Sequence, residues 1–133
     1  YRCDDGIDKL TTTGHSHVWE VSRGSVTEHD LDPSELGIAT AQIDDLLGST
    51  PEHNAGLARA VLAGESGPVR DIVLLNAAEG LVSFALAQDP DQVRRPLVER
   101  LGEQLAVAAE AVDSGRAAAK LDAWARATQS GPS

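Results

Sequence analysis

The densest group of chemically useful side chains lies near the start of the 133-residue sequence. Asp4, Asp5 and Asp8 place three carboxylates within five residues, with Gly6 between the second and the third. Carboxylate oxygens grouped in this way suit a hard cation such as Mg²⁺, which keeps some of its waters and bridges to substrate phosphates. The same pattern also describes an ordinary solvated turn after a strand. Both interpretations stay open.

The other candidate sites carry a weaker signal. His15 and His17 could present two imidazoles, but no third ligand follows at a spacing typical of zinc, so we expect surface or hydrogen-bonding roles. The run from Thr11 to Gly14 lacks the lysine and the glycine framework of a phosphate-binding P-loop, so we expect its hydroxyls to serve loop structure. The single Cys3 cannot close an intrachain disulfide, and no pattern typical of a nucleophilic serine occurs.

Charge and composition exclude several classes of function. With 11 Lys and Arg against 21 Asp and Glu, the net charge is −10, so the surface repels nucleic acid and anionic lipid. No apolar run reaches the roughly 18 residues of a membrane span, and no basic-then-apolar leader opens the chain, so we expect a cytoplasmic location. Because the sequence has no Met and begins at Tyr1, we interpret it as the C-terminal part of a longer protein, opening at the end of a strand.

The elements that must position these residues change in character near residue 40. Residues 17–21 and 26–31 are two β-favouring runs, and Gly24 between them can adopt a positive φ, which predicts a β-hairpin. Pro33 cannot donate to a strand ladder and Gly37 ends any short helical turn, so the chain leaves the sheet between them. A single domain is expected, with a strand and hairpin region over 1–39, a helical region over 40–129 and a tail over 130–133.

Capping residues and prolines predict about five helices in the second region. We place them at residues 40–48, 51–64, 68–87, 90–112 and 117–127. The third is apolar nearly all round and belongs in the centre of the domain. The fourth, capped by Asp89, is an amphipathic surface helix that keeps its charged residues largely away from the apolar stripe: Arg94, Arg95, Glu99, Arg100 and Glu103. We expect Trp19 and Trp124 to be packing residues, because no basic residues accompany them.

Several segments, in order along the chain, carry a resemblance to a known family. They are the run from Asp5 to Thr13, the strand from Val18 to Val21, the corner from Leu31 to Gly37, and the stretches 52–64, 67–78, 111–115 and 121–124. Together they make the chain similar to the C-terminal part of anthranilate phosphoribosyltransferase. The resemblance implies an α/β fold, here the later part of the large α/β domain of the nucleoside phosphorylase and phosphoribosyltransferase type.

The resemblance also implies an activity. It implies a homodimeric, Mg²⁺-dependent enzyme of tryptophan biosynthesis. Such enzymes join anthranilate to phosphoribosyl pyrophosphate and release pyrophosphate. The family's glycine-rich pyrophosphate loop, its Lys-His-Gly-Asn segment and its anthranilate-contacting residues lie upstream of the part matched here. No catalytic or substrate-binding residue can therefore be assigned, and we expect the chain to need the remainder of its own polypeptide for activity.

One family site falls inside the sequence. The family pattern is Asp-Gly-Leu-Asp-Glu, whose adjacent Asp and Glu hold magnesium; Asp8 matches that Asp, while Lys9 stands in place of the Glu. The exchange removes one metal ligand and changes the local charge by two units, so the site is either lost or rewired with Lys9 neutralising pyrophosphate. Two alternatives stay open: a nucleoside phosphorylase or phosphoribosyltransferase paralogue with another acceptor, and a non-catalytic binding protein of the same fold.

Overall fold

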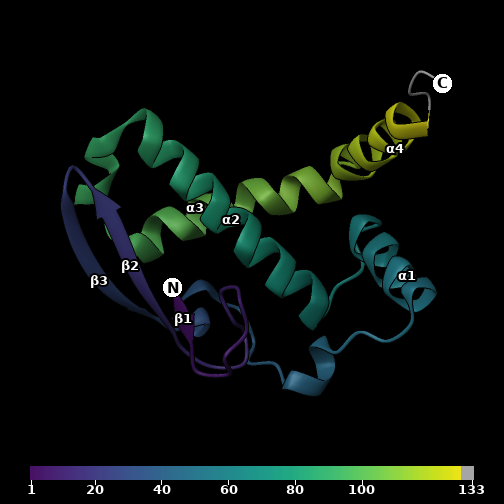
Figure 1. The fold of residues 1–133 in the computed structure, drawn as a ribbon, viewed down its shortest axis with the longest axis horizontal. Helices are drawn as coiled ribbons and strands as arrows, with labels where there is room; N and C mark the ends of the chain where they lie inside the picture. The colour runs from purple at the N-terminus through teal and green to yellow at the C-terminus, as the bar shows by residue number, and fades with distance from the viewer. Residues whose placement is uncertain (130–133) are drawn as a thin grey trace.

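Three antiparallel strands form one layer of the protein in the computed structural model, which describes residues 1–129 (Figure 1). They are β1 (Arg2–Cys3), β2 (Ser16–Ser22) and β3 (Ser25–Leu31), in the order β1-β2-β3. The expected strand end at the start of the chain and the expected hairpin are both confirmed. The carboxylates Asp4, Asp5 and Asp8 follow β1 directly and lie in the first half of the connection to β2.

The hairpin closes through a turn of two residues. Ser22 pairs with Ser25, and Arg23 and Gly24 between them have φ values of 50° and 77°. Positive φ at both central positions is typical of the type I′ turn, whose twist matches that of the flanking strands. The positive φ of Gly24 confirms the prediction, whereas that of Arg23 is a conformation that the sequence alone did not indicate.

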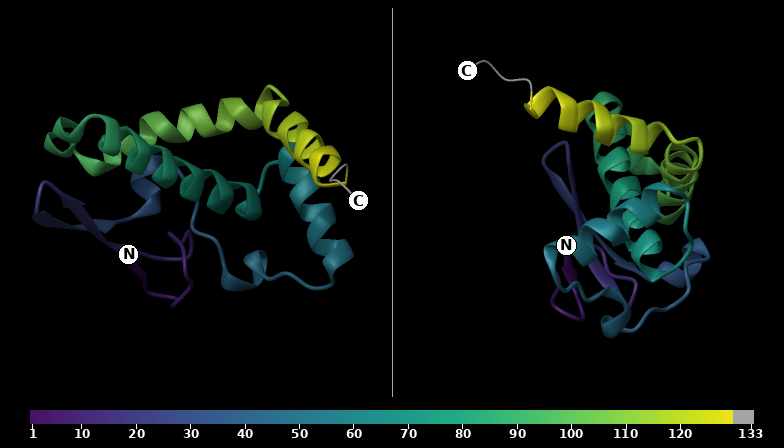
Figure 2. Two further views of the ribbon diagram at one scale, coloured as in Figure 1. Left: turned by 45° about the horizontal axis from the view of Figure 1, so that its top comes forward. Right: turned by 90° about the vertical axis from the view of Figure 1, so that its right-hand side faces the viewer.

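Helices form the second layer. After the 3₁₀ turns η1 (Pro33–Leu36) and η2 (Ile43–Leu46) come α1 (Pro51–Leu62), α2 (Pro68–Gln88), the 3₁₀ turn η3 (Pro90–Arg94), α3 (Leu97–Asp113) and α4 (Arg116–Gln129). In Figure 2, α3 runs beside α2, and α4 lies near α1 at the end remote from the hairpin. The caps follow the predicted chemistry: the Thr50 hydroxyl accepts from the His53 amide, and Gly37, at φ 75°, ends η1. No helix within residues 1–129 is long and apolar enough to cross a membrane.

Two predicted helices are wrong in extent. The helix expected over 40–48 is only the short turn η2, because the Ala41 amide donates to the Thr12 carbonyl (2.9 Å) and the Asp45 carboxylate caps the Gln42 amide (2.9 Å). The helix expected over 90–112 is split into η3 and α3. Pro96 causes the break, since its ring excludes the helical conformation for the residue before it, and that residue is extended here.

The core lies between the sheet and the α2 and α3 pair. Its buried members are Leu10, Leu31, Ile38, Leu75, Ala78, Val82, Leu97 and Leu101. The central place of α2 is confirmed, although Phe84 on another of its faces is 63% exposed. Trp19 and Trp124, expected to be packing residues, are 41% and 65% exposed, but Trp19 packs edge-on against His17 with 4.5 Å between the ring centroids. The predicted tail over 130–133 lies outside the described residues.

Candidate functional site

The candidate site is the acidic loop, which we define as residues 4–15, between β1 and β2. Gly6 gives it its sharp start: its φ is 75°, and its amide donates to the Cys3 carbonyl at 3.1 Å. At the other end the Asp4 amide donates to the His15 carbonyl at 3.2 Å, which draws the two ends of the loop together. This hydrogen bond lies next to the β1–β2 pairing and closes the loop at its base.

Asp5 organises the interior of the acidic loop. One of its oxygens accepts from the hydroxyls of Thr11 (2.5 Å) and Thr13 (2.7 Å), and the other accepts from the Ile7 amide (3.1 Å). Burial alone raises the pKa of Asp5, but the hydrogen bonds from the two threonines outweigh it, so the pKa lies below its ordinary value. The expected structural role of the threonines is confirmed by these bonds.

Asp8 and Lys9 lie at the outside of the acidic loop. Their carboxylate and ammonium form an ion pair, and the Asp8 side chain is 89% exposed. The hydrogen bond and charge of Lys9 lower the pKa of Asp8, so this carboxyl is ionised at neutral pH. No group of three or more His, Cys, Asp or Glu within residues 1–129 could hold a metal ion. Asp8 is paired with the ammonium of Lys9 and not with a second carboxylate, so these two side chains do not form a two-carboxylate magnesium site.

Buried contacts fix the loop to the rest of the molecule. The Asn76 side chain on α2 accepts from the Leu10 amide and donates to the Leu10 carbonyl, both at 2.9 Å. The Cys3 thiol donates to the Lys9 carbonyl at 2.8 Å and lies 3.2 Å from the Ser16 hydroxyl, so this cysteine serves structure. Asp8 and Lys9 therefore lie directly before Leu10, the residue that fixes the loop to α2.

The two histidines singled out by the sequence do not converge on one site. His15 faces Asp30, with 3.1 Å between Nδ1 and Oδ2, whereas His17 faces Glu28, with 3.4 Å between Nε2 and Oε2. The hydrogen bond to Asp30 raises the pKa of His15 above its ordinary value. Each imidazole thus serves a separate pair on the hairpin surface.

A buried ion pair behind the hairpin was not indicated by the sequence pattern. Arg100 on α3 donates from its two terminal nitrogens to the two carboxylate oxygens of Glu20 on β2, at 2.6 and 2.9 Å. Their side chains are 4% and 6% exposed, and His29 adds a third contact to Glu20 at 3.2 Å. Burial raises the pKa of Glu20, but the bonds and charge of Arg100 outweigh this and leave it lowered. The expectation that Arg100 lies away from the apolar stripe is wrong.

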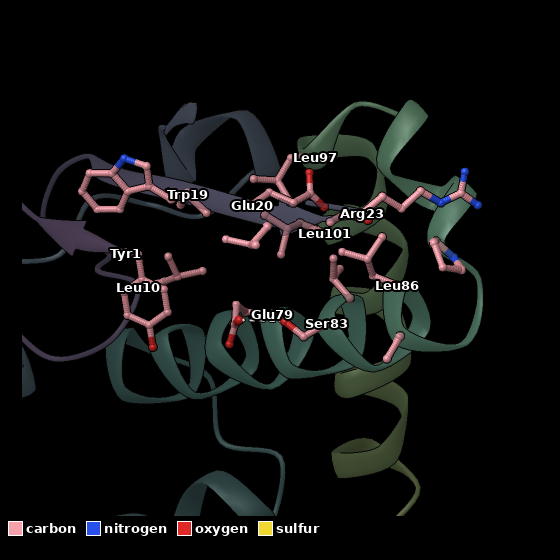
Figure 3. Close-up of a pocket in the computed structure, with 16 residues that line it drawn as sticks. Tyr1, Leu10, Trp19, Glu20, Arg23, Glu79, Ser83, Leu86, Leu97 and Leu101 are labelled. Atoms are coloured by element: carbon pink, nitrogen blue, oxygen red, sulfur yellow. Dashed lines mark hydrogen bonds between the residues drawn. The ribbon is translucent and has the colours of Figure 1, made fainter. Parts of the chain in front are cut away.

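A groove of about 610 Å³ lies between β2 and α2 (Figure 3). Tyr1 and Leu10 stand at one end, and apolar side chains of β2, α2 and α3 form most of its walls. Glu79 and Ser83 of α2 point toward it as the polar part of one wall. Leu10 belongs to both the groove and the acidic loop, so the two features are adjacent.

Comparisons with known proteins place the chain. Residues 2–118 match the glycosyl transferase family, a/b domain. Over 129 residues the chain is 64% identical to an anthranilate phosphoribosyltransferase of Leifsonia xyli, a match that covers 97% of this chain and 37% of that protein. The crystal structure of anthranilate phosphoribosyltransferase from Thermus thermophilus superposes with a TM-score of 0.70 at 36% identity, over 90% of this chain and 32% of that chain.

A third relative bears on fold only. An anthranilate phosphoribosyltransferase from Saccharomyces cerevisiae, solved with Mg bound, gives a TM-score of 0.71 at 24% identity, over 91% of this chain and 32% of that chain. The chain thus spans about a third of the length of the relatives it matches, and the match lies in their C-terminal part. The expected fold class, the later part of an α/β domain, is confirmed.

Proposed function

The chain belongs to the glycosyl transferase family with the a/b domain, and from that membership we propose that it is the C-terminal part of an anthranilate phosphoribosyltransferase. The whole protein would transfer the phosphoribosyl group of phosphoribosyl pyrophosphate to anthranilate in tryptophan biosynthesis and release pyrophosphate. The observation that carries the proposal is the 64% identity to the Leifsonia xyli enzyme across 97% of this chain. The homodimer and the cytoplasmic location stay predictions.

We further propose that Lys9 contributes positive charge to the diphosphate of the substrate. Its ammonium is exposed on the acidic loop, and the hydrogen bond to Asp8 raises its pKa, so it is charged at neutral pH. An ammonium at this point donates directly to phosphate oxygens. Of the adjacent pair Asp8 and Lys9, only Asp8 can be a ligand of magnesium, so we expect a weaker demand for magnesium than in a relative with an Asp-Glu pair.

A chimera tests the activity. In it, this chain replaces the matched 129-residue region of the Leifsonia xyli enzyme, and the loss of anthranilate fluorescence follows turnover. We expect a folded, active chimera, and no turnover by this chain alone. A chimera that melts cooperatively but does not turn over would favour the non-catalytic alternative. If the natural full-length protein consumes phosphoribosyl pyrophosphate with another acceptor but leaves anthranilate unchanged, the paralogue alternative is favoured.

Lys9→Glu in the same chimera tests the role of Lys9. We expect weaker binding of inorganic diphosphate without metal, by at least about tenfold in calorimetry, because the local charge changes by two units. Turnover should fall at low Mg²⁺ and recover when the metal is plentiful. Lys120→Glu, on the exposed face of α4, is the matched charge reversal and should change neither measurement.

Two other outcomes are informative. A Lys9→Glu variant that needs less Mg²⁺ than the parent would show that Lys9 only weakens a metal site. A curve superimposable on that of the parent would leave Asp8 and Lys9 as an ordinary solvated turn. In either case the proposal for Lys9 fails while the activity of the chimera stands.

A further inference from the structure

The backbone after Lys9 is held by side chains from outside the acidic loop. In the peptide group between Lys9 and Leu10, the carbonyl accepts from the Cys3 thiol of β1 at 2.8 Å. The amide of the same peptide group donates to the side-chain oxygen of Asn76 on α2 at 2.9 Å. Both ends of this peptide group are thus bound, one by the sheet and one by the central helix, so its plane cannot turn without breaking a hydrogen bond.

The next peptide group, between Leu10 and Thr11, is held in the same way. Its carbonyl accepts from the side-chain nitrogen of Asn76 at 2.9 Å, and its amide donates to the hydroxyl of Ser16 on β2 at 3.2 Å. Leu10 and Thr11 are buried, so water does not compete for these bonds. We call the two peptide groups and the three side chains that bind them the clamp, in which Asn76 is the side chain that binds both peptide groups.

The Asn76 side chain uses both of its polar atoms. Besides its bonds to Leu10, its nitrogen donates to the Ile72 carbonyl, one turn earlier on α2, at 2.9 Å. That bond fixes the carboxamide to its own helix, so the clamp takes its position from α2. A carboxylate of the same shape could not donate to the two carbonyls, and a leucine side chain could make none of the three bonds. This set of contacts is therefore specific to a short amide side chain.

The Lys9 side chain has far more freedom than the backbone that follows it. It is 48% exposed, and its ammonium pairs with the neighbouring Asp8. A lysine has a flexible four-carbon stem, so the region that its ammonium can reach depends on the direction in which the stem leaves the backbone. The clamp restricts that direction, because it fixes the peptide group that begins at the Lys9 carbonyl.

We propose that Asn76 is a positioning residue for the phosphoribosyl donor, because it holds the backbone from which the Lys9 ammonium reaches the diphosphate. The inference rests on the role proposed above for Lys9. If the backbone at Lys9 and Leu10 were free to rotate, binding would have to order it together with the side chain, and this loss of conformational freedom would weaken the complex. We therefore expect Asn76 to affect the binding of diphosphate through Lys9, in addition to any effect on stability.

A double-mutant cycle in the chimera tests the inference. Binding of inorganic diphosphate without metal is measured by calorimetry for the parent, Asn76→Leu, Lys9→Ala and the double variant. We expect Asn76→Leu to weaken binding by at least about threefold in the parent and by less than about 1.5-fold in the Lys9→Ala background, because its effect passes through that ammonium. Val112→Ala is the control. This buried residue of α3 belongs to a second cluster that contains no residue of the acidic loop, so the change should lower the melting temperature but leave binding unchanged.

Turnover and a second variant add independent readouts. Asn76→Leu should raise the KM for phosphoribosyl pyrophosphate and leave the KM for anthranilate unchanged. Asn76→Asp keeps the size of the side chain and the acceptor for the Leu10 amide but loses both donors, so it should weaken diphosphate binding in the same direction. It carries the test if Asn76→Leu does not melt cooperatively.

The outcomes separate this inference from the proposed function. If Lys9→Ala leaves diphosphate binding unchanged, the role proposed for Lys9 fails and this inference fails with it. If Lys9→Ala weakens binding but the Asn76 variants do not, or if they weaken it equally with and without the Lys9 ammonium, only this inference is overturned. Failure of both Asn76 variants to melt cooperatively would also overturn it, because Asn76 would then serve the fold alone.

Discussion

Arg100→Met should be among the most destabilising single substitutions in this chain. The change keeps an unbranched apolar side chain but removes the guanidinium that makes two bonds to Glu20. Glu20 then stays in a site where its side chain is 6% exposed, with His29 as its remaining partner. Removing one member of a buried ion pair costs about 3–5 kcal/mol, mainly because the other charge is left uncompensated.

The double variant separates pairing from burial. Glu20→Leu with Arg100→Met replaces both charges by apolar groups of similar size, and such replacements are often neutral or stabilising. We therefore expect the double variant to lie within about 1 kcal/mol of the parent, with Glu20→Leu alone destabilised by the unpaired Arg100. The measurement is urea denaturation of all four proteins at neutral pH, completed as a double-mutant cycle.

Acid pH supplies a second check on the same pair. The folded-state pKa of Glu20 is below its ordinary value of 4.5, so its contribution is present above that pH and is lost as pH falls through the folded pKa. In Arg100→Met the penalty comes from the charged carboxylate, so protonation should reduce the difference from the parent. The reasoning is refuted if Arg100→Met costs less than about 1 kcal/mol at neutral pH or if the difference grows in acid.

The remaining predictions concern the loop, two glycines and one histidine. Asp5→Asn should speed hydrogen exchange at the loop amides, because an amide accepts more weakly than a carboxylate from the threonine hydroxyls. Gly37→Ala should cost about 1 kcal/mol in denaturation because φ is 75°, whereas Gly80→Ala, within α2 and with open space around its Cβ, should stabilise by about 0.5–1 kcal/mol. Because the pKa of His15 is raised, its protonated form stabilises the fold fully below the ordinary value of 6.5, and this stabilisation is lost as pH rises through the folded pKa. In His15→Gln we expect the melting temperature to depend less on pH across that range.

Local chemistry made the hairpin and most helix ends predictable. The two β-favouring runs, Gly24 between them and the Thr50 cap act over a few residues, and the structure has them where the sequence indicated. The helix expected over 90–112 failed for an equally local reason, the proline at 96. Proline disfavours the helical conformation at the residue before it, so the break falls there even though the apolar stripe has no interruption.

Contacts between elements far apart in the chain could not be predicted from the sequence. Arg100 follows Leu97 by three residues and adjoins Leu101, so it sits at the flank of the apolar stripe, and β2 widens the buried face to include it. The acidic run was recognisable as a candidate site, but which carboxylate is internal and which is exposed depends on the threonines that turn back onto Asp5. No pattern in one sequence distinguishes these roles.

We expect the hydrogen bonds between Asn76 and Leu10 to form late in folding. They join residues 66 positions apart, and closing so long a segment costs chain entropy that only docked structure can offset. The hairpin closes over two residues, on the microsecond scale typical of such turns, whereas the amide of Asn76 is in position only after α2 has formed and packed. We therefore expect the acidic loop to be completed only after the hydrophobic layers have packed, so that its ordered shape marks the finished fold.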